Sequence, residues 1–186
     1  MEKKFELTDK FVFNTFGIKL FQIKCTKSFK YAKEGDLGGY VEKDENLDQE
    51  SNAWVYGNAW VYGDARVSGN ARVSGDARVS GNARVSGDAR VSGDAWVYGN
   101  AQVYGDADIE NDNNHCGFDC FGSCNRHTHA YLTKDNKVEI TCGCFRGSIE
   151  EFEKEVEKTH SGTIYEKQYK AIINVIKIKF GLTDLI

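Results

Sequence analysis

The strongest constraint on the fold is a six-residue unit, A-x-V-x-G-[DN], which is repeated ten times without interruption between Ala53 and Glu110. A short period repeated this often indicates a solenoid. Ala and Val stand two places apart, so they point to the same side of a strand, whereas Gly and Asn or Asp accept the backbone angles of a turn. Each unit therefore predicts one short strand and one turn. Three units would close a triangular coil in which residues eighteen apart stack on each other.

The same pattern, a small residue two places before an aliphatic one, resembles the hexapeptide-repeat, left-handed parallel β-helix. The wider chain resembles uncharacterised phage and prophage proteins of the hexapeptide-repeat or "polymer-forming" kind. This second resemblance rests on G-D-L-G-G-Y at 35–40, the W-V-Y-G-N-A and R-V-S-G-D-A copies, and C-G-C-F at 142–145. It implies the fold and a phage origin, and it carries over no activity residue by residue.

The predicted fold is mainly β, with three parts. Residues 1–40 alternate in short apolar runs, with turn residues at 14–17 and a phase change that suggests a bulge, and we expect a β meander that caps the solenoid. Residues 41–111 form the left-handed β-helix with eighteen residues per coil, and Val41 and Leu47, on the six-residue phase of the alanines, mark an irregular first coil. Residues 112–186 form an α+β domain with a hairpin and two helices.

Composition argues against two classes of partner. The net charge is −4 and no block of one sign stands out, so nucleic-acid binding through a basic face is not expected. No apolar run approaches the roughly 20 residues that cross a bilayer, and the first residues, M-E-K-K-F, lack the apolar region of a signal peptide. We expect a cytoplasmic protein, in the host cell if it is phage-encoded, whose six cysteines are reduced or bind a metal.

The outward positions of the repeat hold large side chains. Stacking by eighteen places Arg78 between Trp60 and Trp96 on one face, where the guanidinium can stack on an indole. Such a face either only covers the strands or is an interface, since Trp, Tyr and Arg dominate binding hot spots. The candidate binding residues are Trp54, Tyr56, Trp60, Tyr62, Arg78, Trp96, Tyr98 and Tyr104. Because related solenoids associate side by side, we expect a homo-oligomer, with a trimer favoured.

An acyltransferase is the obvious enzyme for such a fold, and the sequence argues against it. Those enzymes use a histidine base near a loop that leaves a coil. The ten repeats contain neither a histidine nor an insertion, and all four histidines follow them. We therefore expect no enzymatic activity.

The C-terminal segment predicts a hairpin, residues 126–133 and 137–145, around Asp135 and Asn136. In the simplest register His129 faces Cys142 and His127 faces Cys144, with all four on one side. Such a face is either an apolar core strand or a Cys₂His₂ zinc site formed by His127, His129, Cys142 and Cys144. Cys116, Cys120 and Cys124 have the spacing of one helix face.

Two amphipathic helices follow, the first with a capping box formed by Ser148 and Glu151.

These features favour a non-enzymatic, phage-type binding protein. Its β-helix would drive assembly and present the aromatic and arginine face and the C-terminal domain to a target. By family context this would serve counter-defence, with the target a host defence protein or a small signalling nucleotide. Two alternatives stay open: a metal- or thiol-dependent enzyme that uses the C-terminal Cys and His residues, and a purely structural self-assembling protein.

Overall fold

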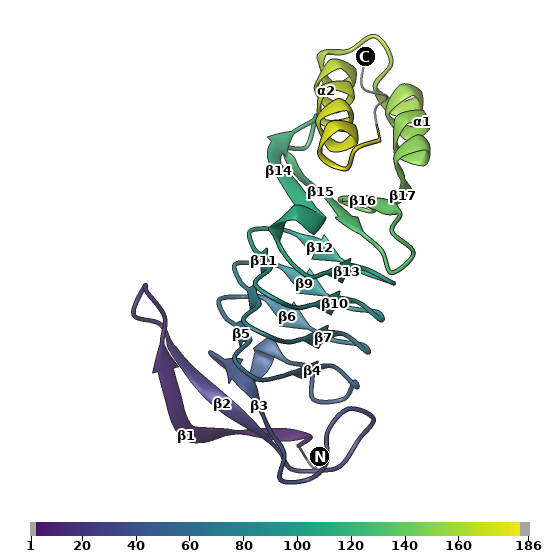
Figure 1. Ribbon diagram of the computed structural model, residues 1–186. Coiled ribbons are helices and arrows are strands. Elements are labelled where there is room, and N and C mark those ends of the chain that lie inside the picture. Colours follow the sequence, from purple (N-terminus) through teal and green to yellow (C-terminus); the bar gives the residue numbers. More distant parts are fainter. Residues whose placement is uncertain (1–2, 183–186) are drawn as a thin grey trace. The chain divides into compact units, whose positions relative to one another are not determined.

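The computed structural model of the protein describes residues 3–182 (Figure 1). The chain divides into two compact units, Met1–Asp112 and Asn113–Ile186, each with its own fold. The first holds the solenoid and the second an antiparallel sheet with two helices. Among the described residues no helix is both long and apolar enough to cross a membrane.

The solenoid has three sides, and each six-residue unit contributes one two-residue strand. One side stacks β4 (Trp54–Val55), β7 (Arg72–Val73), β10 (Arg90–Val91) and β13 (Asp108–Ile109). The second includes β5 (Trp60–Val61), β8 (Arg78–Val79) and β11 (Trp96–Val97), and the third is β6 (Arg66–Val67), β9 (Arg84–Val85) and β12 (Gln102–Val103). Strands pair in parallel with partners eighteen residues away, as in Trp60 with Arg78, so the predicted coil length is confirmed.

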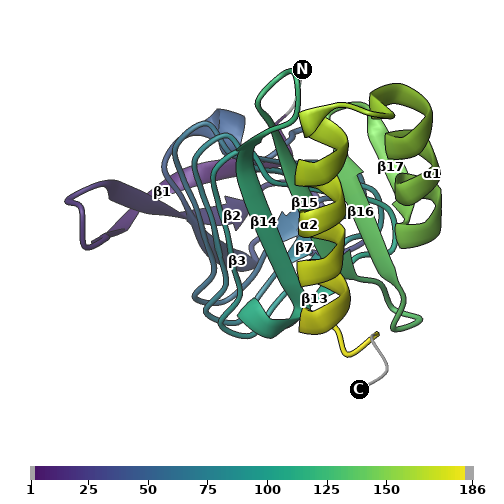
Figure 2. The same ribbon diagram turned by 90° about the horizontal axis from the view of Figure 1, so that it is seen from above.

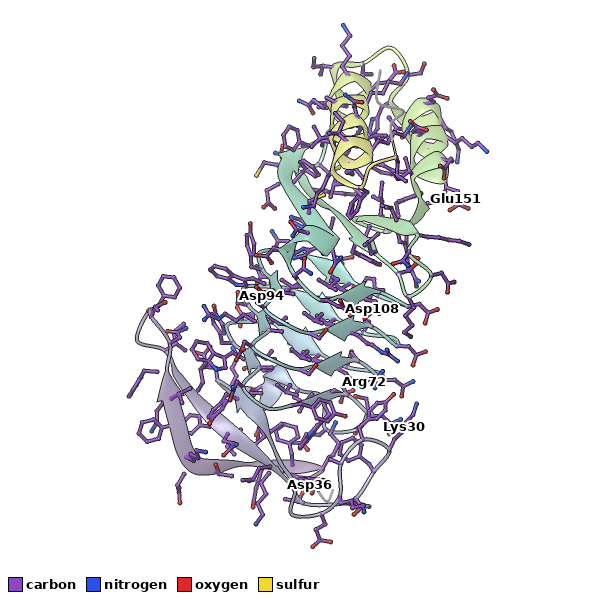
Figure 3. All side chains as sticks on the ribbon, in the orientation of Figure 1. Lys30, Asp36, Arg72, Asp94, Asp108 and Glu151 are labelled. Carbon is purple, nitrogen blue, oxygen red and sulfur yellow. The ribbon has the colours of Figure 1, made fainter. Side chains whose placement is uncertain are left out.

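The interior of the solenoid consists of the alanine and valine positions. Ala53 to Ala107 and Val55 to Ile109 at every sixth residue are all buried, and most have no exposed surface. The residue between Ala and Val points outward, as Arg72 and Asp108 do in Figure 3. Because small and branched side chains alternate inside, three short strands can pack around a narrow core.

The turns are closed by glycine and by ladders of side-chain amides. Gly57 to Gly105, at every sixth residue, adopt positive φ angles that other residues resist. The next residue in the turn bonds along the solenoid: Asn52 donates to Asn70 at 2.9 Å, and Asn70 donates to Asp88 at 3.1 Å. Where an Asn precedes an Asn or Asp in the same column, its amide therefore donates to the next coil, as Asn58 does to Asp76 and Asn82 to Asn100.

The N-terminal strands extend one side of the solenoid. β1 (Phe5–Phe13) and β2 (Lys19–Cys25) form a hairpin with a register shift between Leu7 and Phe11, and β3 (Leu37–Val41) joins β2 to β5. The result is a six-stranded sheet in the order β1-β2-β3-β5-β8-β11. Figures 1 and 2 show the turn end of this hairpin, here called the hairpin arm, projecting from the coil. The predicted β meander is confirmed, and its register shifts lie between Leu7 and Phe11 and between Gln22 and Lys24.

The first coil is irregular for a different reason from the predicted one. Val41 pairs with Val61, and Leu47 forms a bridge to Val67 beside the short 3₁₀ helix η1 (Asp44–Asn46). Both residues therefore occupy valine positions, twenty residues before their partners. The expectation that they continue the alanine positions of the repeat is wrong. Two extra residues in this coil shift the phase of the pattern.

The second unit is a four-stranded antiparallel sheet in the order β14-β15-β16-β17, preceded by η2 (Asp112–Asn114). Its strands are β14 (His115–Phe121), β15 (Arg126–Leu132), β16 (Val138–Cys142) and β17 (Phe145–Ser148). Helices α1 (Ile149–His160) and α2 (Ile164–Lys179) pack on one face of this sheet (Figure 2). The predicted capping box is confirmed, since Ser148 accepts from the Glu151 N–H and the Glu151 side chain accepts from the Ser148 N–H.

Two expectations for this unit are wrong. Cys116 and Cys120 lie on β14, a strand, and not on a helix. In the β15–β16 hairpin, His129 pairs with Thr141 and Thr128 pairs with Cys142, one residue away from the expected register. Because side chains alternate along a strand, a shift of one residue moves a side chain to the other face.

Candidate functional site

Part of the predicted aromatic surface is a column on the outer face of β5, β8 and β11. Strand β8 pairs with β5 on one side and β11 on the other, which places Arg78 between Trp60 and Trp96. The Arg78 guanidinium lies 4.8 Å from the centre of the Trp60 ring. The indole N–H of Trp96 donates to the Ser80 hydroxyl at 3.2 Å. Stacking and this hydrogen bond hold the Arg78 and Trp96 side chains flat on the sheet.

Two of the eight candidate binding residues are buried, so the expectation that they face solvent is wrong for them. Trp54 is 1% exposed because Phe5 and Phe29 pack edge-on against it, with ring centres 6.4 and 5.4 Å away. Tyr62 is 7% exposed in a cluster with Leu20 and Tyr40. Residues of the N-terminal strands and their connection cover both side chains.

The other candidates lie on different faces of the solenoid. Tyr56 flanks the β4 side and donates its hydroxyl to the Tyr31 carbonyl at 3.3 Å, and burial raises its pKa. Tyr104 follows β12 on the third side. Trp96 and Tyr98 are exposed by 37% and 58%, with ring centres 5.5 Å apart. These two residues, here called the Trp96–Tyr98 patch, are the most accessible aromatic groups on the repeat.

Three of the histidines, His115, His127 and His129, share one face of the β14–β15–β16 sheet. His115 and His129 are in hydrogen-bond contact, Nδ1 to Nε2, at 3.0 Å, and His127 Nδ1 lies 2.7 Å from an Asp119 carboxylate oxygen. Nε2 of His127 is buried without a hydrogen-bond partner among the described residues. Tyr131, on the same face, donates to Glu139. This face is a histidine and aromatic layer.

The proposed Cys₂His₂ set is not brought together. Cys142 lies on the opposite face of the sheet, where the Thr128 hydroxyl donates to its sulfur at 3.3 Å and the Tyr169 hydroxyl lies 3.7 Å away. Cys144 lies in the turn before β17 and is exposed. Across residues 3–182, no three His, Cys, Asp or Glu side chains are grouped so as to hold a metal ion.

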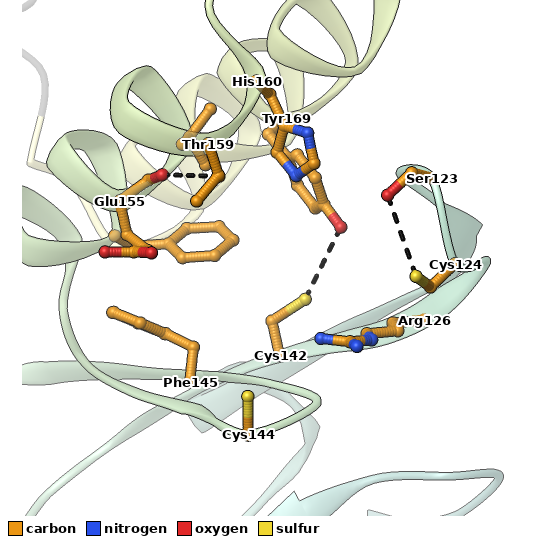
Figure 4. Close-up of a pocket in the computed structure, with 12 residues that line it drawn as sticks. Ser123, Cys124, Arg126, Cys142, Cys144, Phe145, Glu155, Thr159, His160 and Tyr169 are labelled. Atoms are coloured by element: carbon orange, nitrogen blue, oxygen red, sulfur yellow. Dashed lines mark hydrogen bonds between the residues drawn. The ribbon is translucent and has the colours of Figure 1, made fainter.

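The Cys142 side of the sheet opens into a pocket of about 410 Å³ (Figure 4). The turn between β14 and β15, the turn between β16 and β17, and helices α1 and α2 form its walls. Its lining residues are Ser123, Cys124, Arg126, Cys142, Cys144, Phe145, Phe152, Glu155, Val156, Thr159, His160 and Tyr169. The His160 ring stacks on the Tyr169 ring at 5.4 Å, and burial raises the pKa of Tyr169.

Sequence reasoning missed Arg126 and Tyr169 as members of a site. Two glycines give them room: a Cβ on Gly122 would clash with the Tyr169 hydroxyl, and a Cβ on Gly143 would lie 2.7 Å from Arg126 Cδ. Gly143 is visible in the C-G-C segment, but the residue that it accommodates is seventeen positions away in the chain. Only the folded sheet brings the two together.

Comparison with known families identifies the repeat. A family model described as the YdcK beta solenoid repeat matches four overlapping stretches, residues 65–81, 71–86, 77–93 and 83–99. These stretches are the middle of the solenoid, and they support a β-solenoid repeat scaffold. No curated protein is significantly similar to the chain.

Proposed function

We propose that this protein is a non-enzymatic binding protein, in which the solenoid is a rigid scaffold and its exposed aromatic groups contact a target. The observation that carries this proposal is the Trp96–Tyr98 patch. At the same two positions five successive upstream repeats carry Arg and Ser, from Arg66 and Ser68 to Arg90 and Ser92. Exposed Trp and Tyr on a rigid surface offer large contact areas with little loss of side-chain entropy on binding.

The interior of the repeat supports binding over catalysis. The coil interior holds only alanine, valine and one isoleucine from Ala53 to Ile109, so it offers no titratable group for acid–base chemistry. In the second unit Cys142 is buried, and His127 and His129 lie on the other face of the sheet. His160 lines the same pocket as Cys142, but its ring stacks on Tyr169 and, within residues 3–182, forms no hydrogen bond to a cysteine sulfur. The nucleophile and base of a thiol enzyme need mutual hydrogen-bond contact. These observations favour the binding proposal over the thiol or metal enzyme.

The repeat itself supplies a test that preserves the fold. Trp96→Arg with Tyr98→Ser turns the unit A-W-V-Y-G-N into A-R-V-S-G-N, which is the native sequence of residues 65–70. The control exchanges the same two positions of another unit on another side of the solenoid: Arg84→Gln with Ser86→Tyr turns A-R-V-S-G-D into A-Q-V-Y-G-D, the native sequence of residues 101–106. Affinity purification of both variants and wild type from expressing cells, followed by mass spectrometry, compares their bound proteins and small molecules.

We expect the Trp96→Arg/Tyr98→Ser variant to bind the target at least tenfold more weakly and the Arg84→Gln/Ser86→Tyr variant to retain it. Equal retention by both variants would contradict a role for the Trp96–Tyr98 patch. Equal loss in both would point to an effect on the fold, which thermal unfolding of the purified variants measures directly.

The setting that we propose is counter-defence, as the resemblance to phage proteins suggests. In that case the target is a host defence protein, or a small signalling nucleotide that the protein sequesters. Mass spectrometry of the purified material separates the two, since only the first adds a second polypeptide. Cytoplasmic location in the host belongs to the same proposal.

We also propose that the protein self-associates through its solenoid, with a trimer favoured. A flat-sided solenoid offers extended surfaces on which identical copies can pack around a threefold axis. Light scattering coupled to size exclusion at micromolar concentration is expected to give three times the 20.9 kDa mass of one chain. A mass equal to one chain would refute self-association, and in that case the scaffold acts as a monomer.

A further inference from the structure

We propose that the pocket of the second unit binds a small organic anion with a planar apolar body, such as an aromatic carboxylate, sulfonate or phosphate, and that Arg126 is its charge anchor. This site belongs to residues 113–186, whereas the Trp96–Tyr98 patch belongs to residues 1–112, so each proposal stands or fails by its own test.

The size of the pocket fits a small molecule. Its volume of about 410 Å³ lies within the range of roughly 300 to 1,000 Å³ that is typical of small-molecule sites. Such sites combine apolar walls with a few convergent polar groups. Phe145, Phe152 and Val156 form the apolar wall, and Phe145 and Phe152 have ring centres 5.0 Å apart.

The charge in the pocket is divided between two ends. Figure 4 shows the Arg126 guanidinium beside Cys142 and below Cys124, and the Glu155 carboxylate on the opposite side, beyond Cys142. Glu155 is paired with Lys158 at 3.3 Å. No ion pair within the described part of the chain neutralises Arg126, whereas Arg146 on the same sheet is paired with Glu139 at 2.7 Å. The Arg126 end therefore attracts an anion.

Two glycines build this arrangement into the backbone. Gly143 has φ +61° at the β16–β17 turn, and the Arg126 side chain lies across it. Gly122 has φ +73° at the β14–β15 turn, where the Tyr169 hydroxyl lies against it, and its N–H donates to Gln168 at 3.0 Å. Any other residue at either position would displace Arg126 or Tyr169 from the pocket. Both turns thus keep the anion-binding end open.

The chemistry of the ligand follows from these walls. A guanidinium binds carboxylate, sulfonate and phosphate oxygens with paired hydrogen bonds. The Ser123 hydroxyl and the exposed Cys124 lie at the same end, and the phenyl rings beyond Cys142 offer faces on which a planar body can stack. A bare inorganic anion leaves the apolar wall empty, and a neutral arene leaves Arg126 without a partner.

The test uses 2-naphthalenesulfonate as the probe, with the full-length protein in a calorimeter. We expect one probe to bind per chain, with 2-naphthylmethanol and inorganic sulfate each binding at least tenfold more weakly. Arg126→Gln is expected to weaken sulfonate binding at least tenfold, because the sulfonate loses its charge-assisted hydrogen bonds to the guanidinium. Arg146→Gln, an arginine on the same sheet outside the pocket, is the matched control and is expected to leave the affinity unchanged.

Thiol alkylation locates the probe without any substitution. Cys124 and Cys144 are exposed and line the pocket, whereas Cys120 is exposed and lies outside it. The bound probe is expected to slow iodoacetamide labelling of Cys124 and Cys144 severalfold and to leave Cys120 unchanged, as read by peptide mass spectrometry. No binding at millimolar probe, the same affinity in the Arg126→Gln variant, or equal protection of Cys120 would each overturn the site.

Discussion

At the scale of single residues, nine of the ten repeat units depend on a glycine in the turn. Gly75 has φ +67°, and a Cβ there would lie 2.8 Å from the Gly93 carbonyl oxygen in the next coil. Gly57, one coil earlier in the same column, has φ +56°, and a Cβ there would lie 4.0 Å from the Gly75 carbonyl oxygen, so it shares the backbone angle without the close contact. The two positions separate the cost of the backbone angle from the cost of the contact.

We predict that Gly75→Ala lowers the free energy of unfolding by about 3 kcal/mol and Gly57→Ala by about 1 kcal/mol. The smaller value is the cost of a left-handed backbone for a residue with a Cβ, and the larger one adds the steric displacement of the next coil. Urea unfolding followed by circular dichroism measures both. Equal losses of unfolding free energy in the two variants would mean that the close approach of the coils adds nothing to the cost of a Cβ at Gly75.

The same scale shows what periodicity can and cannot predict. The inward positions of Ala and Val follow from their spacing, because a strand alternates its side chains. The burial of Trp54 and Tyr62 does not, since it depends on Phe29 and Leu20, more than twenty residues earlier in the chain. Both aromatic residues occupy outward positions of the repeat, where the pattern alone predicts exposure.

At the scale of elements, the solenoid has two chemically different ends. The outward residues of each coil donate N–H groups to carbonyls of the following coil, as Trp54 does to Ala71. The corresponding carbonyl at the first coil is that of Ala53, and the corresponding N–H at the last coil is that of Trp96. The Lys4 ammonium accordingly donates to the carbonyls of Asp48, Ser51 and Ala53. At the other end, an Asp112 carboxylate oxygen accepts from the Trp96 N–H at 2.8 Å. One charged side chain of the matching sign caps each end.

We predict that Lys4→Met destabilises the first unit by about 3 kcal/mol, because buried carbonyls lose their donor. Lys3→Met is the control: Lys3 forms an exposed ion pair with Asp44, and such pairs contribute about 0–1 kcal/mol. Denaturant unfolding of both variants measures the difference. A loss for Lys4→Met no larger than for Lys3→Met would show that water replaces the ammonium at this end.

The Lys4 cap also has a pH dependence of known sign. Burial lowers the pKa of Lys4 from 10.5 to about 8. Between these values the unfolded chain binds a proton that the folded chain has released, so the free energy of unfolding rises with pH in this window. The wild type is therefore expected to gain stability relative to Lys4→Met from about pH 8 to pH 10.5. Parallel stability curves for the two proteins would contradict the lowered pKa.

The β15–β16 hairpin shows why an element can be predicted while its register is not. Thr133 N–H donates to the Lys137 carbonyl at 2.9 Å, and Asn136 adopts φ +56°, as in a three-residue hairpin loop that ends in a left-handed residue. The sequence predicts a two-residue turn at Asp135 and Asn136 instead. That turn would shift the pairing by one residue and place both histidines on the same face of the hairpin as Cys142. The predicted zinc set depended on that single residue.

At the scale of the whole molecule, the 186 residues form two units with different kinds of core. The first is filled by columns of alanine and valine, and the sheet β1-β2-β3-β5-β8-β11 joins the hairpin arm to the solenoid in one unit. The second is filled by aromatic and branched side chains between the sheet and its helices. Periodicity predicts the first core. The second rests on pairing between strands without a repeat, so its helices and the β15–β16 hairpin follow from the sequence, whereas the register of the hairpin does not.

Separate cores predict separate responses to core substitutions. Val79→Ala removes methyl groups from the interior of the middle coil, and we expect it to lower the free energy of unfolding of residues 1–112 by about 2 kcal/mol. Ile173→Ala, on α2 in the core of the second unit, is expected to destabilise residues 113–186 by about 3 kcal/mol. Native-state hydrogen exchange reads both effects amide by amide. If either substitution lowers protection equally in both units, the chain unfolds as one cooperative body, and the solenoid does not keep its structure independently of the domain that follows it.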